Sequence, residues 1–62
     1  PMWIDGDMIR TDGTVEAIEV YDVRGVRVAA GGEGVDVSSL ERGVYIARGT
    51  TASGPVQIKF AK

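Results

Sequence analysis

The sequence predicts an all-β domain, built as an antiparallel two-layer sandwich of about six or seven strands. Short runs rich in β-branched residues occur along the whole chain, and nine glycines separate them at the spacing of turns. Such runs with regular turn signals are typical of β-sandwiches and barrels. Apolar residues do not recur at helical spacing for two full turns, and the chain has one leucine, so no true helix is expected.

The N-terminal segment, residues 1–14, is expected to form an edge hairpin. An Asp-Gly pair, Asp5-Gly6, follows the short apolar run Met2-Trp3-Ile4. A second pair, Asp12-Gly13, follows Met8-Ile9-Arg10. Asp-Gly pairs between strand-like runs favour hairpins because Gly adopts a positive φ without a steric penalty.

Turn chemistry also divides the remainder of the chain. The segment Asp22-Val23-Arg24-Gly25 predicts a type I turn with Gly25 in the left-handed conformation, which closes a hairpin with a bulge. Gly31–Gly34 and Gly49–Pro55 are rich in small residues and are expected to be open loops. The strands expected between these turns span residues 15–21, 26–30, 35–37, 44–48 and 56–60.

Alternation of apolar and polar residues indicates which side chains form the core. In the last expected strand Val56, Ile58 and Phe60 face inward, while Gln57 and Lys59 face outward. The expected core consists of Ile18, Val20, Val28, Leu40, Tyr45, Ile58 and Phe60.

The segment before the strand at residues 44–48 has its own local signals. Ser38-Ser39-Leu40 is expected to be one helical turn, with Ser38 as its cap and Leu40 packed into the core. Tyr45 comes two residues after Gly43, a position from which its ring points into the sandwich. Its hydroxyl group can then bond to a nearby backbone group, as corner tyrosines do in β-sandwiches.

Composition argues against several classes of function. With 62 residues, the chain is expected to be a single domain, residues 1–62. It has neither Cys nor His, which removes disulfides, the usual nucleophile pairs and the commonest metal ligand. A net charge of −2 and scattered basic residues are unfavourable for binding nucleic acid or anionic lipid. We expect neither an enzyme nor a protein with a cofactor or a metal.

The termini and the hydropathy pattern bear on localisation. No apolar run approaches the length of a transmembrane helix, so no transmembrane segment is expected. No charged and then apolar segment of the kind found in signal peptides opens the chain. Because the chain begins at Pro1 without an initiator Met, we interpret it as a piece of a longer protein.

The carboxylates are interpreted as turn and surface residues. Asp5, Asp7 and Asp12 lie beside glycines, as the ligands of a calcium loop do, but no bidentate Glu closes the segment. A second group of carboxylates consists of Glu16, Glu19 and Asp22. This group could suggest acid–base catalysis, but nothing places a partner at a suitable separation, so it is interpreted as a solvated strand face.

Other candidate residues also have structural interpretations. Trp3 and Tyr21 could form a platform for stacking on sugars, although a buried or half-buried Trp is the preferred interpretation. The glycines of Gly31–Gly34 open no helix and carry no Lys, unlike a phosphate-binding loop. Ser38 and Ser39 have no candidate base, so neither is a predicted nucleophile.

Three stretches, in order along the chain, form a recognisable pattern. The first contains Val20, Tyr21, Asp22, Gly25 and Val28. The second contains Val35, Asp36, Val37, Ser38, Leu40, Gly43, Tyr45 and Ile46. The third contains Ile58, Lys59, Phe60 and Lys62.

On these residues the chain resembles the type A C-terminal sorting domain of the type IX (Por) secretion system of Bacteroidetes-type bacteria. The resemblance covers residues 15–62, while residues 1–14 match only as a generic edge hairpin. One departure is Val26, which occupies the position of a basic residue after Gly25.

The resemblance implies a fold, a function and partners. The fold is an Ig-like β-sandwich, and the function is to direct an attached N-terminal cargo across the outer membrane. The implied partners are the secretion machinery and a surface sortase, which usually removes the domain and joins the cargo to lipopolysaccharide. Implied localisation is the periplasm in transit, then the outer-membrane surface or the extracellular space.

An alternative function is an accessory Ig-like or fibronectin-like module at the end of a secreted enzyme, which binds carbohydrate or protein. Its binding face would contain Trp3 and the expected open loops at Gly31–Gly34 and Gly49–Pro55. The position of the domain in the parent gene distinguishes the two, because a sorting signal must end at the stop codon.

Overall fold

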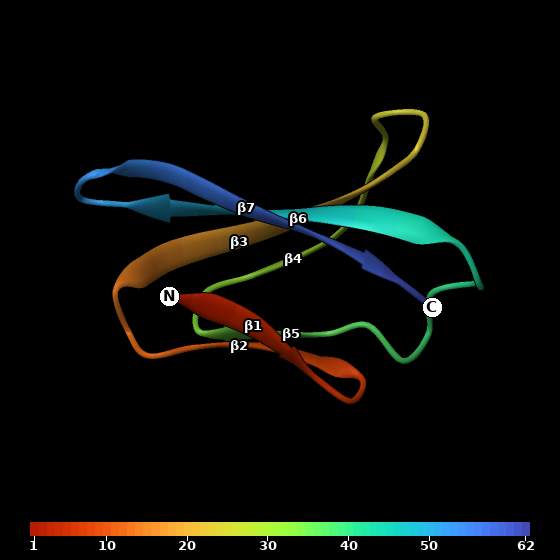
Figure 1. Ribbon diagram of the computed structural model, residues 1–62, viewed down its shortest axis with the longest axis horizontal. Helices are drawn as coiled ribbons and strands as arrows, with labels where there is room; N and C mark the ends of the chain where they lie inside the picture. The colour runs from red at the N-terminus through yellow and green to blue at the C-terminus, as the bar shows by residue number, and fades with distance from the viewer.

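Seven strands form two antiparallel sheets that pack face to face in the computed structural model, which describes residues 1–62 (Figure 1). The smaller sheet has the order β1-β2-β5 and the larger sheet the order β4-β3-β6-β7. The predicted fold class, a small antiparallel sandwich of about six or seven strands without a helix, is confirmed. The strands are β1 (Met2–Asp5), β2 (Met8–Thr11), β3 (Val15–Asp22), β4 (Arg27–Gly31), β5 (Gly34–Asp36), β6 (Val44–Thr51) and β7 (Gly54–Ala61).

The two Asp-Gly pairs of the N-terminal segment have different roles. Asp5-Gly6 lies in the predicted hairpin, because Asp5 pairs with Met8 and Gly6 occupies the turn with a φ of 60°. Asp12-Gly13, by contrast, carries the chain from β2 to β3 in the opposite sheet, so the expectation of a second hairpin is wrong. Asp12 Oδ1 accepts hydrogen bonds from the amide and hydroxyl groups of Thr14, and this local turn redirects the backbone.

The predicted turn between β3 and β4 is confirmed. Gly25 N donates to Asp22 O at 3.0 Å, and Asp22 N donates to Val26 O at the same distance. The φ of Gly25 is 82°, in the left-handed region. A bulge follows, since Val20 pairs with Ala29 whereas Tyr21 pairs with Arg27. Val28 is therefore the extra residue of β4.

That bulge explains why Val28 is wrongly placed in the predicted core. An extra residue shifts the alternation of side chains by one, and Val28 is 36% exposed. The prediction succeeds for Ile18, Val20 and Tyr45, which are buried. Three further predicted residues pack against the core while remaining partly exposed: Leu40, Ile58 and Phe60.

The smaller sheet supplies core residues that the sequence pattern did not reveal. Ile9 is fully buried, although it lies in a strand of four residues. Met2 and Val35, on the other two strands of this sheet, are also buried and absent from the predicted core. Outside this sheet the same is true of Val15, Val37 and Ala47. Val56 faces the same side as Ile58 but lies near the end of β7, where it is 39% exposed, so its predicted inward position is only partly correct.

The two expected open loops are tight connections. Only Gly32 and Glu33 lie between β4 and β5, and a Cβ atom on Gly31 would come within 2.6 Å of the Gly34 carbonyl oxygen. Most of the other expected loop belongs to β6 and β7. Thr51 pairs with Gly54 across a two-residue turn, and Gly49 is packed under Val15.

Candidate functional site

Residues of the three sequence stretches meet at one end of the sandwich. This end, called here the motif end, consists of the β3–β4 turn (residues 22–26), the β5–β6 connection (residues 37–43) and Lys62. Figure 1 shows the β5–β6 connection beside the C-terminus on the right of the molecule, with the β3–β4 turn projecting above them. Asp22 and Tyr45 are partners in the ladder between β3 and β6, which joins the first two stretches directly.

The β5–β6 connection is held by a carboxylate. Asp36 Oδ1 accepts a hydrogen bond from Ser38 N at 2.8 Å, and Leu40 N donates to Val37 O at 3.1 Å. This single turn is not a helix, and Asp36, not Ser38, is its capping side chain. The hydrogen bonds from Ser38 lower the pKa of Asp36 below its ordinary value.

Tyr45 fixes the other end of the same connection. Its hydroxyl group donates to Glu41 O at 2.6 Å, as predicted for a corner tyrosine. Tyr45 is only 7% exposed, and its ring stacks on the ring of Phe60 with the two centroids 5.7 Å apart. A single side chain therefore links β6, β7 and the backbone before Gly43.

Lys62 extends over the connection from the end of β7. Its ammonium group donates to Val37 O and, at 3.1 Å, to Leu40 O, and its side chain is only 17% exposed. The main chain of Lys62 also exchanges two hydrogen bonds with Gly43. Lys62 belongs to the third sequence stretch, but the sequence alone predicts no contact for it. Its hydrogen-bond partners lie between 19 and 25 residues away along the chain, and no local signal marks them.

The first stretch forms the neighbouring hairpin. Asp22 Oδ1 accepts hydrogen bonds from Arg24 N and Val26 N, while its Oδ2 pairs with the Arg24 guanidinium at 2.8 Å. The side-chain bond from Arg24 is the main reason that the pKa of Asp22 is lowered. Between this hairpin and the β5–β6 connection is a hollow of about 330 Å³, whose lining includes Asp22, Val28, Ser39, Leu40, Glu41 and Tyr45.

The motif residues are divided between the core, the motif end and an outer surface. Val20 is buried in the core, and Phe60 packs against it. Tyr21 and Lys59 do not join the motif end. Both lie on the outer face of the larger sheet, in one row across three strands, because Tyr21 pairs with Ile46 and Ile46 pairs with Lys59.

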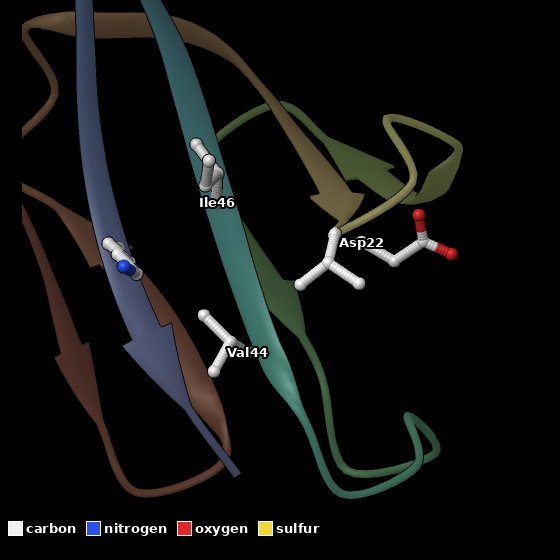
Figure 2. A pocket seen from close by; sticks show the side chains of 5 residues that line it. Asp22, Val44 and Ile46 are labelled. Atoms are coloured by element: carbon white, nitrogen blue, oxygen red, sulfur yellow. The ribbon is translucent and has the colours of Figure 1, made fainter.

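The outer face around that row carries apolar side chains. Figure 2 shows Val44 and Ile46 on β6 and Asp22 at the end of β3. Together with Val23 and Lys59, these residues line a hollow of about 340 Å³. A second hollow of about 330 Å³ adjoins it and shares Val23 and Ile46. The set Tyr21, Val23, Val44, Ile46, Arg48 and Lys59 is called here the outer-face patch.

Charge is unevenly distributed around the sandwich. Arg48 and Lys59 make no ion pair, whereas Glu19 on the same face pairs with Arg27 at 3.0 Å. The β3–β4 turn adds the balanced Asp22–Arg24 pair. The larger sheet and its turn thus hold four of the seven basic residues and three of the nine acidic ones, giving +1 there and −3 elsewhere. The sequence shows scattered basic residues, but folding gathers most of them.

The remaining candidate residues do not form a site. Asp5 pairs with Arg10 and Asp12 with the Pro1 amino group, and no group of three acidic side chains lies close enough to hold a metal ion. Trp3 is 43% exposed on the smaller sheet, so the preferred interpretation of a buried or half-buried Trp overestimates its burial. Glu16 and Glu19 lie on β3, and Glu19 is engaged with Arg27.

Comparisons with protein-family models, curated proteins and solved structures found no match for this chain. Its function is therefore inferred from its own residues and their geometry. The fold contains no helix of the length and apolarity needed to span a membrane.

Proposed function

We propose that this domain is a C-terminal sorting signal of the type IX secretion system, which directs an attached cargo protein across the outer membrane. It acts as a folded recognition element for the secretion machinery. A surface sortase usually removes such a domain and joins the cargo to lipopolysaccharide, whereas some members of the family keep the domain uncleaved. The bond-breaking chemistry belongs to that sortase, and this chain contributes the surface that is recognised.

The observation that carries the proposal is the convergence of the three stretches on one hydrogen-bonded end. Asp36, Tyr45 and Lys62 each bind the backbone of the β5–β6 connection, although they come from three different strands or strand ends. Such a residue set fixes one loop conformation beside the β3–β4 turn. A rigid end of this kind suits recognition by a partner, because binding then requires little ordering of the domain.

The accessory-module alternative has less support from the geometry. It required open loops at Gly31–Gly34 and Gly49–Pro55, and both are tight connections within or between strands. Trp3 remains exposed and could contact a ligand, but it lines none of the three hollows on the surface. The sorting signal is therefore the function proposed.

A fusion experiment tests the proposal. The whole domain is joined to the C-terminus of a foreign secreted protein and expressed in a host with an active type IX system. We expect the fusion on the cell surface or in the medium. A matched fusion carrying Tyr45→Ala, in which the core is disrupted, should remain in the periplasm.

Lys59→Ala separates recognition from folding. Lys59 is exposed and makes no hydrogen bond, so its removal should change the free energy of unfolding by no more than about 0.5 kcal/mol. We expect a fusion that folds normally and is exported less efficiently. If the intact fusion is folded but stays in the periplasm, the sorting function is wrong.

A further inference from the structure

We infer that the outer-face patch is a docking surface for an acidic and apolar segment of a partner protein. The inference deepens the proposed function and rests on it for the choice of host. The patch lies on the face of the larger sheet that points away from the core. It shares Val23 with the motif end, but it contains none of the residues that hold the β5–β6 connection, which are Asp36, Tyr45 and Lys62.

The shape of the patch favours side chains of a protein as its occupants. Two adjoining hollows of about 340 and 330 Å³ share Ile46 and Val23. Val23 is 80% exposed at the tip of the β3–β4 turn, and Ile46 is 36% exposed in the middle of the sheet. Hollows beside exposed aliphatic groups accept individual apolar side chains, as the buried centres of protein interfaces do.

The charge of the patch determines the chemistry of the segment. Lys59 lines the first hollow and Arg48 the second, and neither has an acidic partner in the domain. Of the three acidic residues on β3, Glu19 and Asp22 are already paired with arginines, and Glu16 lies near the start of the strand and lines neither hollow. Two free cations beside apolar hollows are complementary to carboxylates that flank apolar side chains.

Charge also argues against a symmetric pair of copies. Two copies meeting through this face would bring their unpaired Arg48 and Lys59 side chains together, which is unfavourable. A segment from a different protein with net negative charge has no such penalty. The occupant is therefore a segment of a partner protein. The experiments below distinguish it from the two alternative occupants, a second copy of this domain and an anionic lipid surface.

The first experiment uses the export fusion with single charge reversals. Lys59→Glu inverts a cation of the patch, and Arg10→Glu is the matched control on the outer face of the smaller sheet, where Arg10 makes only an exposed pair with Asp5. We expect Lys59→Glu to lower export about ten-fold and Arg10→Glu to leave it unchanged. Equal loss from both reversals, with both domains folded, would overturn the docking surface.

The second experiment tests the apolar part of the patch. Ile46→Thr keeps a β-branched side chain on the strand but removes an apolar contact. Ile4→Thr is the matched control, since Ile4 is 38% exposed, close to the 36% of Ile46. Export should fall with Ile46→Thr and remain normal with Ile4→Thr, after thermal melting has established that both variants fold. Normal export of Ile46→Thr would contradict the inference.

The third experiment identifies the occupant. A photo-cross-linking amino acid replaces Gln57, which lines the second hollow, and a control replaces Trp3. We expect position 57 to give a protein adduct whose linked peptide contains Asp or Glu beside apolar residues, and Lys59→Glu to abolish it. The inference would be overturned by cross-links to lipopolysaccharide, to phospholipid or to a second fusion molecule. It would also be overturned if the fusion were exported without any cross-link. If the folded parent fusion is not exported at all, the sorting function is refuted. The docking surface is then judged separately, from the cross-links that position 57 forms in the periplasm.

Discussion

The ammonium group of Lys62 lies 3.1 Å from the carbonyl oxygen of Leu40 and also donates a hydrogen bond to Val37 O. The end of β7 is thereby joined to the connection that leads into β6. Hydrogen bonds from charged donors are stronger than neutral ones, and two carbonyl groups would lose their partner if this ammonium group were removed. Lys62 is thus a structural residue within the motif end.

We expect Lys62→Met to lower the free energy of unfolding by about 1–2 kcal/mol, because the aliphatic stem is kept and the charged hydrogen bonds are lost. Urea denaturation measures the change. Lys59→Ala is the matched control, since Lys59 is exposed and lacks such bonds, and its effect should stay within about 0.5 kcal/mol. Equal effects of the two substitutions would show that the Lys62 contacts do not stabilise the fold.

Tyr45 allows its hydrogen bond and its packing to be separated. Tyr45→Phe removes the bond to Glu41 O but keeps the stack on Phe60, and should cost about 1 kcal/mol. Tyr45→Ala also removes the buried ring and should cost about 3–5 kcal/mol, which leaves so small a domain largely unfolded at room temperature. Thermal melting followed by circular dichroism compares the two. An unchanged melting temperature for Tyr45→Ala would contradict the core assignment.

Stability should fall in acid, and Asp12 is one cause. The Thr14 hydroxyl and amide groups, followed by the Pro1 amino group, lower the pKa of Asp12 from its ordinary value of 3.8 to about 2. Because the folded state has the lower pKa, it favours the ionised carboxylate. The resulting stabilisation is present above about pH 4 and is lost as the pH falls towards about 2.

Asp12→Asn tests this contribution. The Asn side-chain oxygen can accept the same hydrogen bonds from Thr14 but does not titrate in this range. The urea midpoint of this variant should therefore fall less than that of the parent domain between about pH 5 and about pH 2. Asp22 and Asp36, whose pKa values are also lowered, keep part of the acid sensitivity in both proteins. Identical pH profiles would exclude Asp12 as a contributor.

Local chemistry explains which parts of the fold the sequence could predict. The β3–β4 turn was predictable because the carboxylate of Asp22 and the positive φ of Gly25 act within five residues. The Tyr45 bond to Glu41 O spans four residues and was likewise predictable. Both features depend on short-range contacts that a single sequence contains.

Features that depend on distant strands were not predictable. Asp5-Gly6 and Asp12-Gly13 have the same dipeptide, yet only the first forms a hairpin, because the sheet joined by the next strand is set by packing. The bulge that exposes Val28 also depends on the pairing partner on β3. The outer-face patch was missed for the same reason, since its residues are brought together by three strands and a turn.

The backbone of the β3–β4 turn depends on a left-handed conformation at Gly25. Gly25 has a φ of 82°, and a Cβ atom there would meet no other atom within 4 Å. Gly25→Ala should therefore destabilise the domain through backbone conformation alone, by about 1 kcal/mol. Gly32→Ala is the matched control, because Gly32 also has open space around it but does not have a positive φ.

Denaturant titration of the two glycine variants, with the parent domain alongside, gives the comparison. Gly32→Ala should be neutral or slightly stabilising, because it restricts the unfolded chain without straining the folded one. Gly25→Ala should lower the midpoint without changing the slope of the transition, as expected when the surface exposed on unfolding is unchanged. Equal midpoints for the two variants would show that the turn can adopt a conformation without the left-handed residue. Val23, at the tip of that turn, would then have no fixed place in the outer-face patch.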